Sequence, residues 1–312
     1  MKTAVLRFLV CPVCRVDLRL SSHVEDRGEI LEGRLTCTAC GAEYSITRGV
    51  PRFVPSGAYA SSFGFQWTRF RTVQLDSYNG TDQSAREFAS TTGWGVETCR
   101  GRVVLDAGVG AGRFAEVVAA MGAEVVGVDL TTAVDAAYLN IGQRARVHLV
   151  QADIFALPFR DGTFDLAYSI GVLHHTPDPR AAFARVATTV RKGGEVAVYL
   201  YAGYGPWFRG SDLLRRVTTR LPLRVMFWLS AAAVPLAFVY RVPVVGRLLR
   251  LAVPISLHPD WRWRWLNTFD WYTPTYQWKL LYPEVLRWFR EEGFGEVEVF
   301  DDPIRVRGAK AG

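Results

Sequence analysis

The sequence lacks an apolar segment near its start that is long enough for a secretory signal, since charged residues interrupt the first positions and Cys11 follows closely. We therefore expect the chain in the cytoplasm, where thiols stay reduced and serve metals or chemistry rather than disulfides. There is also no internal repeat and no low-complexity tract. With 312 residues, 49% of them apolar and 21% charged, the composition argues against disorder and favours a large domain plus a small one.

Acidic residues are scarce in one stretch. Residues 203–258 contain eight arginines and a single aspartate, which accounts for the whole formal net charge of +7. The rest of the chain is close to neutral. An anionic partner is therefore to be sought first at this segment.

A glycine-rich turn is present, but it lacks the last glycine of the dinucleotide-binding pattern. The run Val103–Asp106 is a buried strand that leads through Gly108, Gly110 and Gly112 into a helix. Such a turn is tight and lets a ligand lie against bare backbone. A dinucleotide site would need GxGxxG, but Arg113 stands at the last position, which argues against nicotinamide binding. Asp129 ends the next strand and is the candidate partner of a ribose.

After residue 101 the spacing of apolar residues alternates repeatedly between the period of a strand and that of a helix. Continuous apolar strands joined by helices predict a parallel sheet covered on both faces. A helix over Pro283–Glu292 and an antiparallel hairpin joined by Asp301-Asp302-Pro303 complete seven strands. The predicted fold is a Rossmann-like α/β sheet, with parallel strands at Arg102–Asp106, Glu124–Asp129, Arg146–Val150, Phe164–Ser169 and Glu195–Tyr201, and hairpin strands at Glu296–Phe300 and Ile304–Arg307.

These motifs, in this order, resemble the class I S-adenosylmethionine-dependent methyltransferases. The resemblance implies that Asp106 and the glycines hold the methionine part of the cofactor, and that Asp129 takes both ribose hydroxyls. It also implies that Asp153 binds the adenine amine with Ile154 against the ring, and that residues 66–69 form a lid. The implied cofactor-binding residues are Asp106, Gly108, Gly110, Gly112, Arg113, Asp129, Leu130, Asp153, Ile154, Ser169, Trp67 and Arg69.

Four of the five cysteines form two close pairs, and the fifth, Cys99, is interpreted as a structural thiol. Cys11, Cys14, Cys37 and Cys40 give CxxC, a 22-residue gap and CxxC. Four thiolates on two turns suit a closed tetrahedral zinc site that stabilises a small domain. The module resembles the small zinc-ribbon proteins that activate methyltransferases and, more loosely, the ribbon of some ribosomal RNA methyltransferases. Whether it grips a substrate or only stabilises the chain stays open.

The candidate catalytic residues are His174, His175 and Asp270. Methyl transfer from a sulfonium is an in-line displacement that needs alignment and, for a hydroxyl or an acidic carbon, a base. The two histidines follow the fourth strand, at the sheet edge where open α/β folds bind ligands. The alternatives are that His174 only packs in the core and that the segment around Asp270 is an aromatic hinge.

About 80 residues lie between the fifth strand and the last helix, more than a loop requires. They include an uncharged 16-residue run, Val225–Tyr240, which is interrupted by Pro235 and is short of the ~20 residues of a spanning helix. We interpret this insertion as helices that cap the active site. The hypothesis is that the cap admits a hydrophobic acceptor and rests on an anionic membrane surface at the inner face of the membrane; the alternative is a cap buried against its own domain.

The expected organisation has five parts, at 1–56 (zinc ribbon), 57–100 (helical lid), 101–202 (cofactor core), 203–281 (cap) and 282–312 (final helix and hairpin). The preferred function is an S-adenosylmethionine-dependent methyltransferase acting on an oxygen, nitrogen or carbon atom of a small biosynthetic acceptor, a lipophilic one among the options. One alternative is an RNA methyltransferase that holds RNA through the ribbon and the basic cap. The other is a non-catalytic module that binds cofactor and a protein. The sequence leaves the acceptor and the oligomeric state open.

Overall fold

The computed structural model covers the chain and describes all residues except 55–60, 205–207 and 302–303. The predicted boundary between residues 56 and 57 and the Asp302-Pro303 part of the hairpin turn therefore lie outside the described residues. The other predicted elements can be compared directly with the structure.

The core of the molecule is a seven-stranded sheet, as predicted. Five neighbouring strands, from β9 to the edge strand β7, run parallel, and β11 is antiparallel to both of its neighbours. Strand β9 begins directly after helix α7, earlier than the sequence indicates. In spatial order the strands are β10 (Phe294–Phe300), β11 (Arg305–Lys310), β9 (Val190–Tyr199), β8 (Phe164–Ile170), β5 (Val103–Ala107), β6 (Glu124–Asp129) and β7 (Val147–Gln151).

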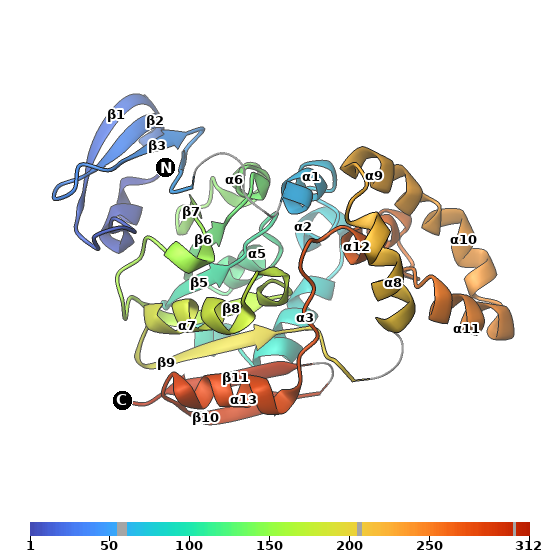
Figure 1. Cartoon of the computed structure of the whole chain (residues 1–312). Helices are drawn as coiled ribbons and strands as arrows, with labels where there is room; N and C mark the ends of the chain where they lie inside the picture. The colour runs from blue at the N-terminus through green and yellow to red at the C-terminus, as the bar shows by residue number, and fades with distance from the viewer. Residues whose placement is uncertain (55–60, 205–207, 302–303) are drawn as a thin grey trace.

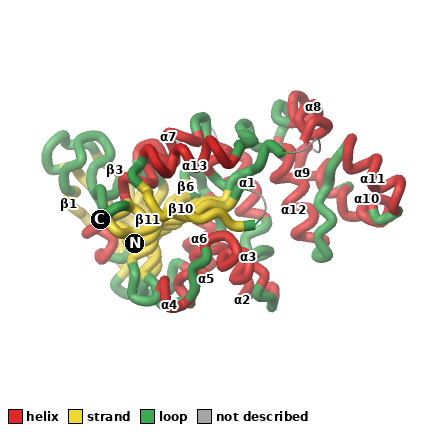
Figure 2. The backbone as a smooth tube through the Cα atoms, turned by 90° about the horizontal axis from the view of Figure 1, so that it is seen from below, coloured by secondary structure: helices red, strands yellow, loops and turns green. Residues whose placement is uncertain are grey.

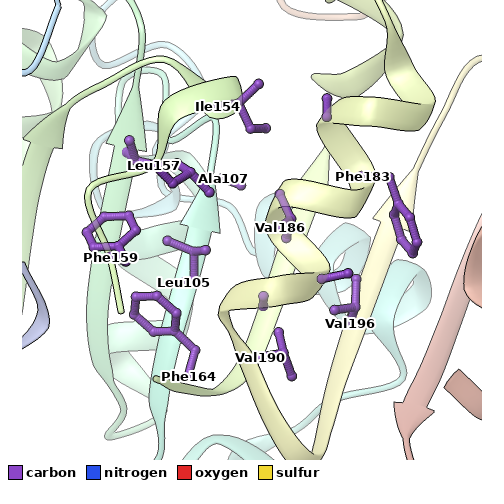
Figure 3. Packing of buried hydrophobic residues seen from close by; sticks show 14 of the residues in the cluster. Leu105, Ala107, Ile154, Leu157, Phe159, Phe164, Phe183, Val186, Val190 and Val196 are labelled. Carbon is purple, nitrogen blue, oxygen red and sulfur yellow. The ribbon is translucent and has the colours of Figure 1, made fainter. Parts of the chain in front are cut away.

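Both faces of the sheet are buried because consecutive strand residues point to opposite sides. On one face Leu105 packs with Phe183 and Val186 of helix α7 (Pro179–Thr189), as Figure 3 shows. On the other face Val104 packs against Phe88. Helix α13 (Tyr282–Glu291) shares the first face, and α3 (Gln83–Thr92), α4 (Val96–Cys99), α5 (Arg113–Ala120) and α6 (Ala133–Ile141) contribute to the second.

The N-terminal module shares the first of these cores. It consists of η1 (Thr3–Phe8) and the antiparallel strands β1 (Leu18–Asp26), β2 (Glu29–Cys37), β3 (Glu43–Thr47) and β4 (Val50–Pro51). Phe8 packs against Phe164, with ring centroids 6.1 Å apart. The backbone N–H of Phe53 donates to Gln151 O at 2.8 Å, which extends the main sheet at its β7 edge. The module is thus built into the larger domain.

The insertion forms helices, as predicted, and they lie together at the end of the molecule opposite the N-terminal module (Figures 1 and 2). Helix α12 is central: its Leu266 and Phe269 pack with Phe227 and with Phe70, which follows α1 (Ser61–Arg69). The short α2 (Asp76–Asn79) comes next in the chain. The cap helices are α8 (Phe208–Thr218), α9 (Leu223–Ala231), α10 (Ala233–Tyr240), α11 (Pro243–Ala252) and α12 (Trp261–Tyr272).

Because the N-terminal module and the sheet share one core, we expect one cooperative unfolding transition. Phe8→Ala should lower the free energy of unfolding by about 3 kcal/mol, since a large buried ring is lost. Val13→Ala, at a side chain 75% exposed in the same module, is the matched control and should change little. Calorimetry that resolved two separate transitions in the unmodified chain would contradict the shared core.

Candidate cofactor and metal sites

The turn after β5 has a backbone that glycine adopts readily. Gly108, Gly110 and Gly112 have φ values of 104°, 52° and 92°. A Cβ on Gly108 would lie 2.3 Å from the side chain of Val172, so any other residue there would clash. The N–H groups of Gly108 and Val109 donate to the carbonyl oxygen of Val128 at 2.8 and 2.9 Å. These two bonds tie the turn to the end of β6.

The carboxylate of Asp129 lies directly against this turn. It accepts hydrogen bonds from Gly110 N at 3.0 Å and from both the N–H and the hydroxyl of Thr131 at 2.8 Å. Burial raises the pKa of Asp129, and the donors from Thr131 and Gly110 oppose that rise. A carboxylate at the tip of the second strand, beside a bare glycine turn, has the placement needed to accept bonds from two hydroxyls of a sugar.

Both features open into a cavity of about 650 Å³ at the carboxyl ends of the parallel strands. Gly108, Asp129 and Ile154 line it from the ends of β5, β6 and β7. Trp67 of α1 covers the turn, because a Cβ on Gly110 would lie 3.2 Å from the indole nitrogen. A bare backbone cradle, an acid and a flanking apolar side chain fit the shape and chemistry of an adenosyl ligand.

The cavity continues past β8 and β9, where its wall changes. His175, in η3 (Leu173–His175), lines it together with Tyr199, Tyr201 and Asp270. His175 Nδ1 lies 2.8 Å from the carbonyl oxygen of Tyr276, which can only accept, so Nδ1 carries the proton and Nε2 keeps its lone pair. Burial lowers the pKa of His175 to about 4, so the ring is neutral at physiological pH.

Asp270 comes from α12 and brings the cap to the same wall. It accepts a hydrogen bond from Gln66 Nε2 at 3.2 Å. Burial raises the pKa of Asp270 to about 6, while Gln66 and Arg215 act in the opposite direction. Arg215 is itself buried and donates to the carbonyl oxygens of Trp271 at 2.9 Å and Pro274 at 2.6 Å. The bond from Gln66 joins the cap to the lid, and the bonds of Arg215 join α8 to the end of α12 within the cap.

Asp106, Ser169 and Asp153 are among the predicted residues that do not line the cavity, and they lie beneath it or behind its wall. Asp106 is buried and accepts a bond from Tyr168 Oη at 2.8 Å, and burial raises the pKa of Asp106 to about 7. Ser169 donates to Ala107 O at 2.7 Å within the sheet. Asp153 caps η2 (Ile154–Ala156) by accepting from Phe155 N at 3.0 Å. These side chains support the turn and the loop from outside.

The remaining predicted residues divide in the same way. Leu130 and Arg113 line the cavity, and Arg113 also pairs with Glu87 at 2.6 Å. Gly112 is the residue before α5, and the guanidinium of Arg69 stacks over the rings of Phe65 and Phe227, between the lid and the cap.

His174 is buried beside His175 but does not line the cavity. Its ring stacks on Tyr201, with centroids 3.8 Å apart, and neither ring nitrogen has a hydrogen-bond partner among the described residues. Burial and the neighbouring His175 lower the pKa of His174 well below its ordinary value. The geometry therefore fits the packing role for His174 and leaves His175 as the histidine that faces a ligand.

Several lining residues were not singled out from the sequence. Tyr201 follows a parallel strand, and its position at that strand's carboxyl end was a usable signal. Arg250 comes from α11, Ile255 and His258 come from the loop that follows it, and no local pattern marks them. They reach the cavity only because the cap folds back over the sheet.

The four cysteines of the N-terminal module converge, although they come from two distant turns. All four sulfur atoms lie within 4.8 Å of one another, with separations of 3.3, 3.6 and 3.7 Å for three of the pairs. A tetrahedron with Zn–S bonds of about 2.3 Å has edges of about 3.8 Å. The N–H groups of Ala39 and Cys40 point at Cys37 Sγ, both at 3.4 Å. The set fits one structural zinc ion held by Cys11, Cys14, Cys37 and Cys40.

The zinc module contacts the loop that carries Ile154. Arg15, next to a zinc ligand, donates to Leu157 O at 2.9 Å, and Val10 N donates to Pro158 O at 2.9 Å. No described residue of the first 54 lines the cavity. Among the two roles left open for the ribbon, this geometry favours stabilisation, directed at the loop beside the cavity.

Two protein-family models match separate parts of the chain. The family model described as a methyltransferase domain matches residues 105–198, and the one described as Trm112p-like protein matches residues 2–49. The first match runs from β5 to β9 and contains the turn, Asp129 and His175. The second contains all four cysteines.

Curated relatives match the same core. A ubiquinone biosynthesis O-methyltransferase of Aromatoleum aromaticum is 40% identical over 100 residues, 31% of this chain and 42% of that protein. Phosphoethanolamine N-methyltransferase 2 of Caenorhabditis elegans is 34% identical over 110 residues, 34% of this chain and 25% of that protein. The chain thus spans less than half of the length of these relatives. Their names differ in the acceptor atom, so the shared core does not determine it.

Two solved structures cover more of the chain at low identity. The complex between the Haloferax volcanii Trm112 methyltransferase activator and a protein described as a methyltransferase aligns with 82% of this chain and 100% of that one, at 12% identity and a TM-score of 0.48. Magnesium protoporphyrin IX methyltransferase from Synechocystis, with bound S-adenosylhomocysteine, aligns with 80% of this chain and 84% of that one, at 15% identity and a TM-score of 0.42.

Loss of zinc should weaken ligand binding as well as the fold. Cys37→Ser should lower the zinc content, the melting temperature and the affinity for S-adenosylhomocysteine, because the ribbon holds the loop after Ile154. Ala39→Ser, at an exposed position between two ligands, is the matched control. Elemental analysis and calorimetry measure all three quantities. Unchanged affinity in a zinc-free but folded chain would refute the coupling.

Asp129→Ala should raise the Kd of S-adenosylhomocysteine about tenfold to a hundredfold, because hydrogen bonds to a charged group contribute about 1.5–3 kcal/mol. Titration calorimetry measures it, and Glu97→Ala, an exposed acid on α4, is the control. Equal affinities in a well-folded Asp129→Ala chain would mean that the sugar of the ligand does not contact this carboxylate.

Proposed function

Because residues 105–198 form a methyltransferase domain joined to a Trm112p-like domain, we propose that the chain is an S-adenosylmethionine-dependent methyltransferase that methylates a hydroxyl group of a small lipophilic molecule. The observation that carries the proposal is a single cavity. Its β5–β6–β7 part has the glycine turn and Asp129, and its β8–β9 part has the neutral His175.

The first part of the cavity accounts for cofactor binding. The glycine turn takes the methionine portion, Asp129 accepts bonds from the ribose hydroxyls, and Ile154 packs on the adenine ring. S-adenosylmethionine supplies an electrophilic methyl group on a sulfonium. Trp67 and the cap shield that group from water, which would otherwise compete with the acceptor.

The second part accounts for the acceptor. As the new oxygen–carbon bond forms, the carbon–sulfur bond breaks and its electron pair stays on sulfur. His175 Nε2 takes the hydroxyl proton, for which its tautomer is already correct. The hydrogen bond from Nδ1 to Tyr276 O holds the ring in place and stabilises the imidazolium that forms when Nε2 takes the proton. An amine acceptor would need less help from a base.

The cavity wall supports a lipophilic acceptor. Trp271, Leu266 and Ile255 of the cap line it, and Phe63 of α1 faces His175, with ring centroids 5.2 Å apart. The ubiquinone biosynthesis O-methyltransferases among the relatives are named for a lipophilic product. We extend that class of acceptor, a hydroxylated hydrophobic ring or chain, to this chain.

His175→Asn should lower kcat at least about a hundredfold and leave cofactor affinity unchanged, because asparagine can keep the bond to Tyr276 O but cannot accept the proton. His23→Asn, at an exposed histidine of the ribbon, is the control. The assay transfers a radiolabelled methyl group to a lipid extract of cells and counts the organic phase. Label in RNA instead would support the RNA methyltransferase, and no transfer with intact cofactor binding would support the non-catalytic module.

The pH profile tests the base independently. His175 acts in its unprotonated form, which is present above its pKa of about 4 and lost as the pH falls through that value. Because Asp270 in the same wall has a pKa of about 6, the profile is measured on Asp270→Asn, for which we expect kcat/KM to stay level from pH 8 down to pH 6. A decline centred near pH 6.5, the ordinary value for histidine, would contradict a base that is buried and neutral.

A further inference from the structure

Apolar side chains are concentrated on the outside of the cap. More than half of the large apolar side chains that are exposed in the described part of the chain lie between Leu213 and Val253. Six of them, which we call the cap patch, are each more than 60% exposed: Leu213, Val217, Trp228, Phe238, Val244 and Leu248. A patch of this kind on a monomer marks an interaction surface.

The charges in the segment that follows Asp212 all have one sign as far as Asp260. No aspartate or glutamate occurs between Asp212 and Asp260. Six arginines of this segment have exposed side chains, namely Arg216, Arg220, Arg224, Arg241, Arg247 and Arg250. An acidic lipid bilayer has anionic headgroups at its surface and apolar acyl chains just beneath. Arginines interleaved with large exposed apolar side chains are complementary to both layers.

Hydrogen bonds to α12 hold one face of α9 and α10 inside the protein, which limits the face that can contact a membrane. Trp265 Nε1 donates to Phe227 O at 2.7 Å, and Arg264 donates to Val234 O at 2.9 Å. The 18-residue stretch Leu223–Tyr240 is long and apolar enough to be considered as a membrane span, and 33% of it is buried inside the protein. Because α9 and α10 are bonded to α12 on one side, only their other side is available to lipid.

The cap patch and the cavity meet on α11. In this helix only Gly246 is buried, so α11 is not covered by its own domain. Arg250 is exposed on α11 and also lines the cavity, as do Pro254 and Ile255 just beyond its end. A lipophilic molecule leaving a bilayer beneath the patch would therefore have the cavity rim beside it.

We propose that the cap patch and its arginines form a docking surface for an anionic lipid bilayer, on which α8 to α11 lie flat. The apolar side chains enter the interface between headgroups and acyl chains, and the arginines contact lipid phosphates. The docking is independent of the chemistry at His175, so it extends the proposed function without resting on the methyl-transfer step.

The test is flotation of the full chain with vesicles of phosphatidylcholine alone or mixed with phosphatidylglycerol. We expect binding to the mixed vesicles, little binding to the neutral ones, and loss of binding at high salt, which screens the arginines. Phe238→Ser with Val244→Ser, and separately Arg241→Glu with Arg247→Glu, should each reduce partitioning about tenfold or more. His175→Asn should bind like the unmodified chain, which separates this proposal from the catalytic one.

The control variants carry the same kinds of substitution, apolar to serine and arginine to glutamate, at positions outside the cap. Leu139→Ser with Tyr78→Ser removes two exposed apolar side chains that lie outside the cap, and Arg19→Glu with Arg100→Glu reverses two exposed charges there. Both should bind vesicles normally. All the substituted apolar and arginine positions are exposed, so the melting temperatures of these variants should stay close to that of the unmodified chain.

Four outcomes would overturn the proposal. Equal binding to neutral and anionic vesicles would remove the role of charge, and binding that resists high salt and alkaline extraction would indicate a spanning segment. Self-association that the Phe238→Ser, Val244→Ser change abolishes, without vesicle binding, would assign the patch to a second copy. RNA binding through the arginines, with no vesicle binding, would assign the surface to nucleic acid.

Discussion

The placement of the turn after β5 is the constraint on which the site depends. Two backbone bonds join the N–H groups of Gly108 and Val109 to Val128 O, and a third joins Gly110 N to the carboxylate of Asp129. These bonds bring the end of β6 against the turn. Position 108 of the turn requires glycine, because Val172 leaves no space there for a Cβ. The carboxylate and the bare backbone therefore face one cavity as a rigid pair, and binding a ligand there requires little reorganisation.

Two additions to the sheet act on that cavity from opposite sides. The zinc ribbon contacts the outside of the loop after β7, through Arg15 and Val10, and shares a core with β5 and β8 through Phe8. The cap covers the other side through α12, whose Asp270 accepts from Gln66 of α1. The cap also shields His175 from water. This burial lowers the pKa of His175, so the ring stays neutral and its Nε2 can take a proton.

The cap has two surfaces with different tasks. Its inner surface is bonded and packed, as the contacts of Arg264 and Trp265 show, and it completes the cavity. Its outer surface combines exposed apolar side chains with arginines, and no acid occurs in the sequence between Asp212 and Asp260. An insertion that both closes an apolar cavity and presents such a surface supports the proposals of a lipophilic acceptor and of docking on a bilayer, and α11 joins the two surfaces at Arg250.

Local sequence determined the parts of this protein that depend on period and spacing. Apolar runs, glycines at 108, 110 and 112 and the two CxxC pairs predicted the parallel sheet, the turn, Asp129 and a four-sulfur site, because each depends on residues close in the chain. Tertiary structure alone decided which side chains line the cavity. It directed His175 inward and His174 into a stack with Tyr201, put Asp106 and Asp153 behind the wall, and brought Arg250 and His258 across from the cap. Those placements depend on how distant helices pack and on which polar groups lose water, and neither is encoded in a local pattern.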